Sequence, residues 1–467
     1  MRSYAPLLAA AVTIAAAALP ASPADAQMQA RRAYDFVDSV GICTHFGWRK
    51  SVYETAFDRM QSALVDLGIR YIRQKPGSPF TLKRLAQLQG STGVLLQATV
   101  DTSADDSNFD ARELDPGMIA NFVGAAVQGL GAGAFVAFEG PNEYDNTAKQ
   151  GGNPDWGRDL RTYMQQVSQV VRGTPAIAQL PIAAPSMAQN KAAVFQQLGD
   201  LSAVSNRGNL HAYSGERPLG FALDEFIGLA QMVNPGQQIV ISEYGWNTAA
   251  NRWQGHPLTD AARAKYQARA MATIFTRPVI DRAFIYQLAD PSEDAALANP
   301  LLHFGLLGTD LQPTMTYAAV RNVMHLLCDN AGNAGTAPLN ASLSGSLQNV
   351  RQVLLQKASG AYYLLLWQEV ASYEQPKPAN KLVAQQWTPA PQSVTLGFSQ
   401  PIASVRTFLP TALDGDADGG KRPKASFDAP SSVTLQVPDE LLVVEIIPQG
   451  VAVPGFPTGC SFTPSGR

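Results

Sequence analysis

The sequence predicts an α/β protein that consists of a (β/α)8 TIM barrel followed by an antiparallel β-sandwich. Between Val40 and Leu327, eight short apolar runs alternate with amphipathic segments. Runs that are apolar on both faces are typical of buried parallel strands, and strict alternation with helices requires a parallel sheet. Eight units in roughly 290 residues fit a barrel, for which about 250 is typical. After Cys328, strand-like runs follow one another without a convincing helix, which is typical of a sandwich.

The barrel strands and helices can be assigned in order. Phe57, Met60, Leu64 and Leu67 are spaced for one face of a helix, and Thr259 can cap the helix that starts near Ala261. An open doubly wound sheet is the alternative, but its phosphate loop is missing because the glycines of 128–134 precede a strand. The eight strand-like runs are 40–46, 69–73, 93–100, 134–140, 180–186, 208–214, 238–245 and 283–290.

We expect the barrel to span residues 33–328 and the sandwich to span 329–467, with 330–346 as a polar, Gly-rich connection. Within the sandwich, Asp414, Asp416 and Asp418 alternate as in a calcium loop, but the twelfth position holds Ala425 instead of Glu. A solvated hairpin is the favoured interpretation, and calcium binding stays open.

Residues 1–26 have the pattern of a signal peptide. Arg2 supplies the positive charge, 7–19 is an Ala-rich apolar run, and Ala24-Asp25-Ala26 is a small-x-small cleavage pattern. The apolar run is too short for the ~20 residues of a membrane span. We therefore expect a secreted or periplasmic protein with no transmembrane segment after cleavage; an uncleaved anchor is the alternative.

The composition is that of a globular protein with a large core, because 46% of its 467 residues are hydrophobic and 16% are charged. The net charge is −3 and no Lys/Arg cluster occurs, so nucleic-acid binding has no electrostatic basis. We expect a monomer.

Three cysteines, Cys43, Cys328 and Cys460, have no metal-site spacing. Cys328 closes the last barrel helix and Cys460 follows the final strand, and sandwich domains often return beside their starting point. We expect a Cys328–Cys460 disulfide and a free, buried Cys43.

The carboxyl ends of the barrel strands carry the polar and aromatic residues expected of a catalytic site. Glu143 and Glu243 come from different strands and should face one pocket. Glycosidic cleavage needs such a pair, because one acid protonates the leaving oxygen while a carboxylate attacks or stabilises the anomeric carbon. The other candidates, which could donate hydrogen bonds or stack on sugar rings, are Asn142, Arg73, His45, Trp48, His211, Tyr213, Trp246 and Tyr286.

These residues, in this strand order, resemble the glycoside hydrolases of clan A, which are retaining enzymes built on a (β/α)8 barrel. The segments "GIRYIRQ" and "EGPNE" are similar to the ends of strands two and four in family 39, and the barrel-plus-sandwich order also matches families 39 and 30. The resemblance covers most of residues 38–327. It implies that Asn142-Glu143 carries the acid/base, that Glu243 is the nucleophile, and that Arg73, His211 and Tyr213 occupy the matching supporting positions.

The resemblance implies an exported retaining β-glycoside hydrolase that cleaves a polysaccharide or oligosaccharide by double displacement, with no cofactor and no metal. Asn142 would bind the sugar 2-hydroxyl, while Arg73 and Tyr213 would position Glu243 and keep it ionised. A catalytically silent carbohydrate-binding barrel in envelope polysaccharide assembly is one alternative. A transglycosylase, which would use the same residues, is another.

Two of these assignments have an alternative, and two further residues bear on the comparison. Glu139 could be the acid in place of Glu143, although no Asn precedes it. His45 could be a core histidine or a substrate contact. Gln287 stands on strand eight, where many clan members have Trp. Trp367 is expected in the sandwich core.

Overall fold

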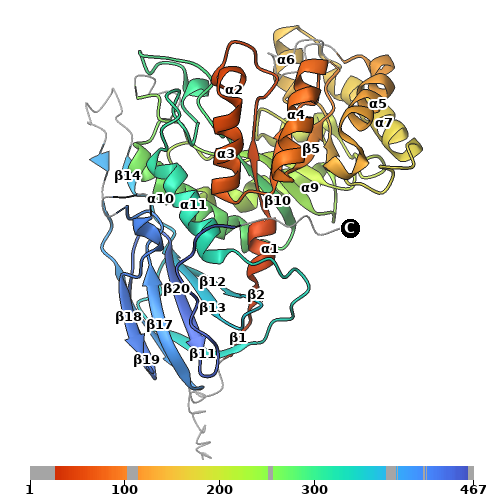
Figure 1. Ribbon diagram of the computed structural model, residues 1–467. Coiled ribbons are helices and arrows are strands. Elements are labelled where there is room, and N and C mark those ends of the chain that lie inside the picture. Colours follow the sequence, from red (N-terminus) through yellow and green to blue (C-terminus); the bar gives the residue numbers. More distant parts are fainter. Residues whose placement is uncertain are drawn as a thin grey trace, which may run out of the picture.

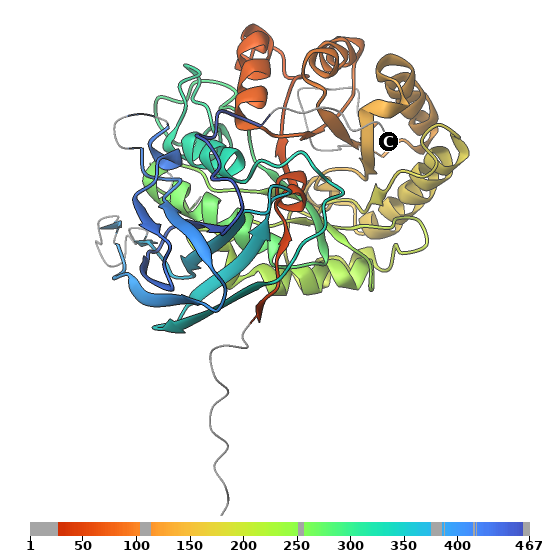
Figure 2. The same cartoon turned by 60° about the horizontal axis from the view of Figure 1, so that its bottom comes forward.

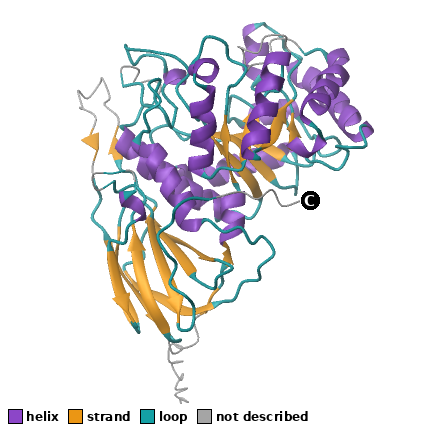
Figure 3. Ribbon diagram, viewed as in Figure 1, coloured by secondary structure: helices purple, strands orange, loops and turns teal. Residues whose placement is uncertain are grey.

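The computed structural model describes residues 27–102, 114–250, 256–374, 385–386, 388–413, 416 and 418–460. It has two parts, a (β/α)8 barrel and a β-sandwich against one side of it (Figure 1). Helices surround the barrel strands, whereas the sandwich is almost entirely strand (Figure 3). The predicted fold class is confirmed.

Eight parallel strands form the barrel in the order β7-β6-β5-β4-β3-β10-β9-β8. Hydrogen bonds between Ile182 and the chain just before β8, with a bridge between Ala183 and Arg207, bring the two edge strands together. The eighth strand begins three residues earlier than predicted. The strands are β3 (Val40–Cys43), β4 (Tyr71–Gln74), β5 (Leu95–Thr99), β6 (Phe135–Glu139), β7 (Ile182–Ala183), β8 (Gly208–His211), β9 (Ile239–Tyr244) and β10 (Ile280–Ile285).

The helices follow the apolar spacing of the sequence. The predicted face of Phe57, Met60, Leu64 and Leu67 is buried, and the Thr259 hydroxyl accepts a hydrogen bond from the Ala262 N–H as an N-cap. The helices are α1 (Ala33–Asp38), α2 (Val52–Thr55), α3 (Phe57–Leu67), α4 (Pro79–Thr92), α5 (Ile119–Leu130), α6 (Tyr144–Gln150), α7 (Trp156–Gly173), α8 (Ala192–Leu198), α9 (Leu223–Val233), α10 (Asp260–Phe275) and α11 (Met315–Leu327).

The sandwich consists of a four-stranded sheet, β1-β11-β16-β19, and a six-stranded sheet, β18-β17-β20-β13-β12-β2; β14 (Tyr373–Glu374) and β15 (Gln385–Gln386) pair separately. The main strands are β1 (Gln27–Met28), β2 (Arg31–Arg32), β11 (Leu339–Gly345), β12 (Val350–Gln356), β13 (Tyr362–Gln368), β16 (Gln392–Phe398), β17 (Ile402–Phe408), β18 (Ala425–Asp428), β19 (Ser432–Val437) and β20 (Leu442–Pro448).

Two parts of the sandwich differ from the sequence prediction. Strand β11 lies inside the segment 330–346, which was predicted to be a connection, because its alternate residues Leu339 and Ala341 are buried between the sheets. The N-terminal strands β1 and β2 also join the sandwich, where β1 pairs with β11 and β2 with β12. The first described residues of the chain therefore belong to the sandwich, and the barrel strands follow them in the sequence.

Helix α10 joins the two parts. Arg269 is buried and donates hydrogen bonds to the carbonyls of Gln368 and Val370, while Lys265 forms an ion pair with Asp439. The sandwich lies against the green and teal barrel helices (Figure 2). Trp367 is buried, but in the core that the sandwich shares with the barrel and not between the two sheets, where it was predicted, because its neighbour Leu366 takes the face toward the other sheet.

The cysteine predictions are confirmed: Cys328 and Cys460 form a disulfide, and Cys43 is free and buried. In the loop of 414–420, Asp414 lies outside the described residues. Asp416 pairs with Arg422 at 2.7 Å and Asp418 pairs with Arg321 at 2.6 Å, so both described carboxylates have cationic partners.

Within the described residues, none of the helices combines the length and apolar character that a membrane crossing requires. The predicted signal peptide, residues 1–26, lies outside the described part of the chain.

Candidate active site

Arg73, at the end of β4, lies at the centre of the polar network inside the barrel mouth. Its side chain is 0% exposed. The guanidinium donates from Nε and Nη2 to both oxygens of Glu139, from Nη2 to Asn142 Oδ1 at 2.7 Å, and from Nη1 to Glu243 Oε1 at 2.6 Å. One cation thus fixes three side chains from strands four and seven.

Glu139, the last residue of β6, is the buried counterion of this arginine. Gln97 Nε2 donates to Glu139 Oε2 at 2.7 Å, and Asn209 Nδ2 donates to Oε1 at 3.1 Å. Burial raises the pKa of the Glu139 carboxyl, but attraction to Arg73 and these hydrogen bonds outweigh it and hold the pKa below its usual value. Sequence reasoning considered Glu139 only as a rival acid and missed Gln97 and Asn209.

Glu243, near the end of β9, projects into the barrel because the strand register shifts at this point. The pairing of β9 with both neighbours skips a residue between Ile241 and Glu243 or Tyr244. Such irregularities redirect side chains and are common beside active sites. Tyr213 donates to Glu243 Oε2 at 2.6 Å, so with Arg73 both carboxylate oxygens are held.

The pKa of Glu243 is raised, first because the carboxyl is buried; His211, Arg73 and Tyr213 each lower it without overcoming burial. The expected contacts of Arg73 and Tyr213 with Glu243 are present. Their effect on ionisation, however, is smaller than the opposing effect of burial.

Glu143 follows the turn after β6 and has a left-handed backbone, with φ 45° and ψ 36°. A non-glycine residue in this conformation stores strain of a kind that concentrates at functional sites. Its N–H donates to the Ser186 carbonyl at 3.1 Å, which ties it to the loop after β7. The side chain is 23% exposed, and burial raises its pKa.

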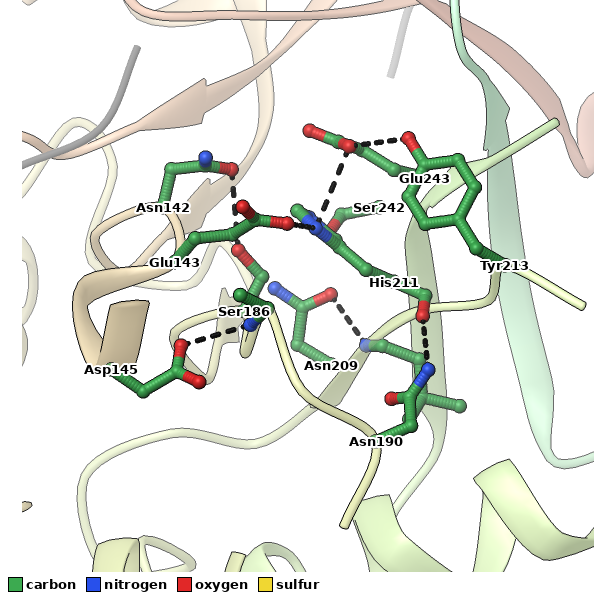
Figure 4. Close-up of polar contacts among 12 residues, drawn as sticks. Asn142, Glu143, Asp145, Ser186, Asn190, Asn209, His211, Tyr213, Ser242 and Glu243 are labelled. Atoms are coloured by element: carbon green, nitrogen blue, oxygen red, sulfur yellow. Dashed lines mark hydrogen bonds and ion pairs between the residues drawn. The ribbon is translucent and has the colours of Figure 1, made fainter. Parts of the chain in front are cut away.

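His211 lies between the two glutamates (Figure 4). Its Nδ1 is 2.7 Å from Glu143 Oε1 and 3.5 Å from Glu243 Oε2. A ring nitrogen of His211 and one carboxylate oxygen from each of Glu143 and Glu243 all lie within 4.8 Å of one another. The set could hold a divalent cation by composition, but Glu243 already pairs with the Arg73 guanidinium, which repels a metal ion there.

The residues around Glu143 fix its loop. Asn142 Oδ1 accepts hydrogen bonds from Arg73 and from Ser186 Oγ, which orients its amide. Asp145 is 2% exposed, and its Oδ1 accepts from the Ala188 N–H at 2.9 Å (Figure 4). These bonds connect the start of α6 to the loop that follows β7.

An aromatic cluster lines the strand-one and strand-eight side. His45 is 1% exposed and stacks on Trp48 with ring centroids 3.9 Å apart, with Tyr286 in edge contact at 5.6 Å. Burial and then Arg73 lower the pKa of His45 to about 3, so it stays neutral. Trp48 is the more exposed of the stacked pair, and His45 supports it from beneath.

One sequence candidate, Trp246, lies away from this cluster. Trp246 is buried in edge contact with Tyr266 of α10, and its Nε1 donates to the Arg217 carbonyl at 3.2 Å. Its ring therefore packs against the barrel wall. Gln287, by contrast, is buried beside His45, with which its side chain interacts, and its Nε2 donates to the Leu301 carbonyl at 3.3 Å.

No family model matches the sequence, and no curated protein matches it either. Solved structures match most of the chain. A family 39 glycoside hydrolase from the gut symbiont Bacteroides cellulosilyticus has a TM-score of 0.58 and 13% identity, covering 88% of this chain and 82% of its own. A glucosidase from Croceicoccus marinus has a TM-score of 0.56 and 14% identity, and the match covers 92% of this chain and 97% of the glucosidase. A monomeric β-xylosidase from Caulobacter crescentus has a TM-score of 0.57 and 10% identity, and the match covers 90% of this chain and 98% of the xylosidase. At such identities the likeness concerns the fold, where it agrees with the resemblance predicted from the motifs.

Proposed function

We propose that this chain is a retaining β-glycoside hydrolase that acts by double displacement. The observation that carries the proposal is the short distance between Glu143 and Glu243, which come from strands four and seven. A carboxylate oxygen of one lies within 4.8 Å of a carboxylate oxygen of the other. Retaining enzymes have carboxyl groups about 5–5.5 Å apart, whereas inverting enzymes leave about 6.5–9.5 Å for a water molecule. This close approach supports the retaining assignment over the inverting one.

The two carboxyl groups have environments suited to different roles. Arg73 and Tyr213 hold both oxygens of Glu243, so it is oriented to attack an anomeric carbon. Glu143 is partly exposed, and burial raises its pKa, which favours the protonated form that a general acid needs. The pKa of Glu243 is raised as well, so the contacts with Arg73 and Tyr213, and not the pKa, distinguish the nucleophile. It would protonate the leaving oxygen in the first step and activate water in the second. Asn142, whose Oδ1 accepts from Arg73, would donate from Nδ2 to the sugar 2-hydroxyl.

The proposal includes export. The N-terminal pattern of residues 1–26 supports it. The Cys328–Cys460 disulfide also supports it, because such bonds persist in oxidising compartments. Fractionation of cells that express the full chain, with N-terminal sequencing of the product, tests it; a product in the cytoplasm that retains residues 1–26 would contradict it.

A panel of nitrophenyl β-glycosides, followed by proton NMR of the first product formed, tests the reaction. We expect hydrolysis of at least one glycoside, with the β-anomer appearing before mutarotation. Absence of turnover on the whole panel and on polysaccharides would favour a silent binding barrel. An α-anomer as first product would exclude double displacement. Addition of acceptor sugars would reveal transglycosylation.

A further inference from the structure

A cavity of about 330 Å³ lies far from the candidate active site. It is partly open and is lined by the end of α11, the six-stranded sheet and the segment 454–459, which the Cys328–Cys460 disulfide holds nearby. Barrel helices run antiparallel to the strands, so the end of α11 lies at the amino end of the barrel, opposite the mouth that holds Glu143.

The wall of this cavity combines aromatic rings with cations. Tyr363, Phe408 and Phe456 contribute apolar faces. The charged lining residues are Lys357, Arg406, Lys421 and Glu445.

Two of the three cations have carboxylate partners. Arg406 Nε pairs with Glu445, and Arg406 Nη2 donates to the Pro454 carbonyl at 2.9 Å. Lys421 Nζ lies 2.9 Å from Asp418 Oδ1 and 3.2 Å from His325 Nδ1. These charges are compensated within the protein.

Lys357 is the exception. Its ammonium lies 4.5 Å from the centroid of the Tyr363 ring, and no described residue places a carboxylate oxygen within ion-pair distance of it. Burial lowers the pKa of Lys357 to about 8, although the charges of Glu445 and Asp329 act in the opposite direction. The cavity is partly open and Lys357 is half-buried. A cation in such a partly desolvated site without a contacting anion is able to form an ion pair with a bound anion, and that pair is stronger than it would be in open water.

We propose that this cavity binds a small cyclic organic acid whose single carboxylate pairs with Lys357 and whose ring lies against the aromatic wall. The volume fits such a ligand, since small-molecule pockets begin near 300 Å³ and a water molecule occupies only about 30 Å³. The charge balance fits a single negative charge. This site is independent of the proposed glycosidase activity.

Benzoate and benzamide are matched probes, because they share a ring and similar size but differ in charge. Thermal unfolding and calorimetric titration of the full chain should reveal saturable binding of benzoate and none of benzamide at equal concentration. Lys357→Met retains the aliphatic stem over Tyr363 and should weaken benzoate binding about tenfold or more, the value of a charged hydrogen bond. Lys83→Met, at an exposed lysine of α4, should bind as the wild type does.

The unliganded melting temperature of Lys357→Met tests whether that variant is folded. We expect it to be no lower than that of the wild type, because the substitution removes an uncompensated charge. Turnover on any active glycoside should be unchanged. Equal binding of benzoate and benzamide, undiminished benzoate binding by Lys357→Met, or no saturable binding by the wild type would each overturn the proposal.

The pH dependence provides a second measurement on the wild type. Benzoate stays ionised from pH 6 to 9, so its affinity should fall as the pH rises through about 8, where Lys357 loses its proton. Burial raises the pKa of Tyr363 beyond this range and lowers the pKa of His325, which also lines the cavity, below its usual value, so neither group accounts for such a change. A flat profile would contradict Lys357 as the anion's partner.

Discussion

The last residue of β6 and the turn that follows it hold two glutamates, four positions apart, in opposite environments. Glu139 is fully buried and accepts hydrogen bonds from Arg73, Gln97 and Asn209. Glu143 is partly exposed, has a left-handed backbone, and contacts His211. The pKa of the first carboxyl is lowered and that of the second is raised.

The difference arises from what each carboxyl contacts. Both are desolvated, which by itself raises a carboxyl pKa. Glu139 shares the Arg73 guanidinium through three hydrogen bonds, whereas Arg73 reaches Glu143 only as a weaker, more distant charge. The strand end thus supplies a fixed anion that keeps Arg73 in place, and the turn supplies an acid that can exchange its proton.

The largest expected effect lies outside this pair, at Glu243, and it sets the scale for the comparison. Glu243→Ala removes the nucleophile, which is needed whatever group leaves. We expect turnover to fall by on the order of 10⁴-fold or more on every substrate. If azide rescues this variant, the product should be an α-glycosyl azide, and rescue with a β-product would contradict the assignment.

The second prediction separates Glu143 from Glu139 by leaving group. Glu143→Ala should lower turnover of natural glycosides by about 10²–10⁴-fold, because their leaving oxygen requires protonation. Dinitrophenyl glycosides should still glycosylate this variant, and azide should speed deglycosylation to give a β-glycosyl azide. If Glu139→Ala shows this leaving-group dependence and Glu143→Ala does not, the roles are reversed.

The third prediction concerns stability. Glu139→Gln leaves the buried Arg73 without its main counterion, so the free energy of unfolding should fall by roughly 3–5 kcal/mol in urea denaturation. Glu143→Gln is the matched control and should change it little. Because the pKa of Glu139 is lowered by folding, its contribution is present above the unfolded value of about 4.3 and is lost as the pH falls through the folded value. Equal destabilisation by both variants at neutral pH would contradict the claim that Glu139, and not Glu143, is the main counterion of Arg73.

The fourth and smallest effect is on the pH profile. Glu143 must be protonated to act as an acid, and its pKa is raised, so kcat/KM should decline only above the usual carboxyl range. Folding also raises the pKa of Glu143, so its proton stabilises the protein at low pH and this contribution disappears as the pH rises through the folded value. Glu143→Gln should abolish the basic limb for activated substrates, whereas a limb that persists would point to another acid.

Much of the barrel could be predicted because strands that are buried on both faces appear in the sequence as short apolar runs, and these runs alternate regularly with amphipathic helices. The ends of strands four, six and seven were recognisable from Asn142-Glu143, His211-x-Tyr213 and Glu243. Strand β11 was not, because five of its seven residues are small or polar and its partners, β1 and β16, are distant in sequence.

The function of Glu139 and the position of Trp246 could not be read from the sequence for a different reason. A strand-end glutamate is recognised as a counterion only when the arginine that faces it is known, and Arg73 is 66 positions away. Trp246 follows the strand-seven end, but its indole turns outward to contact the α10 residue Tyr266. Motifs locate residues along the chain, whereas side-chain direction depends on neighbouring elements.

Covalent trapping tests the central assignment most directly. Once an active aryl glycoside is known, its 2-deoxy-2-fluoro dinitrophenyl analogue should inactivate the enzyme, because glycosylation still proceeds while hydrolysis of the intermediate is slowed. Mass spectrometry of the digested protein should then find one fluoroglycosyl group on Glu243. A label on Glu143 or Glu139, or an active enzyme that never accumulates a label and releases inverted product, would contradict the account.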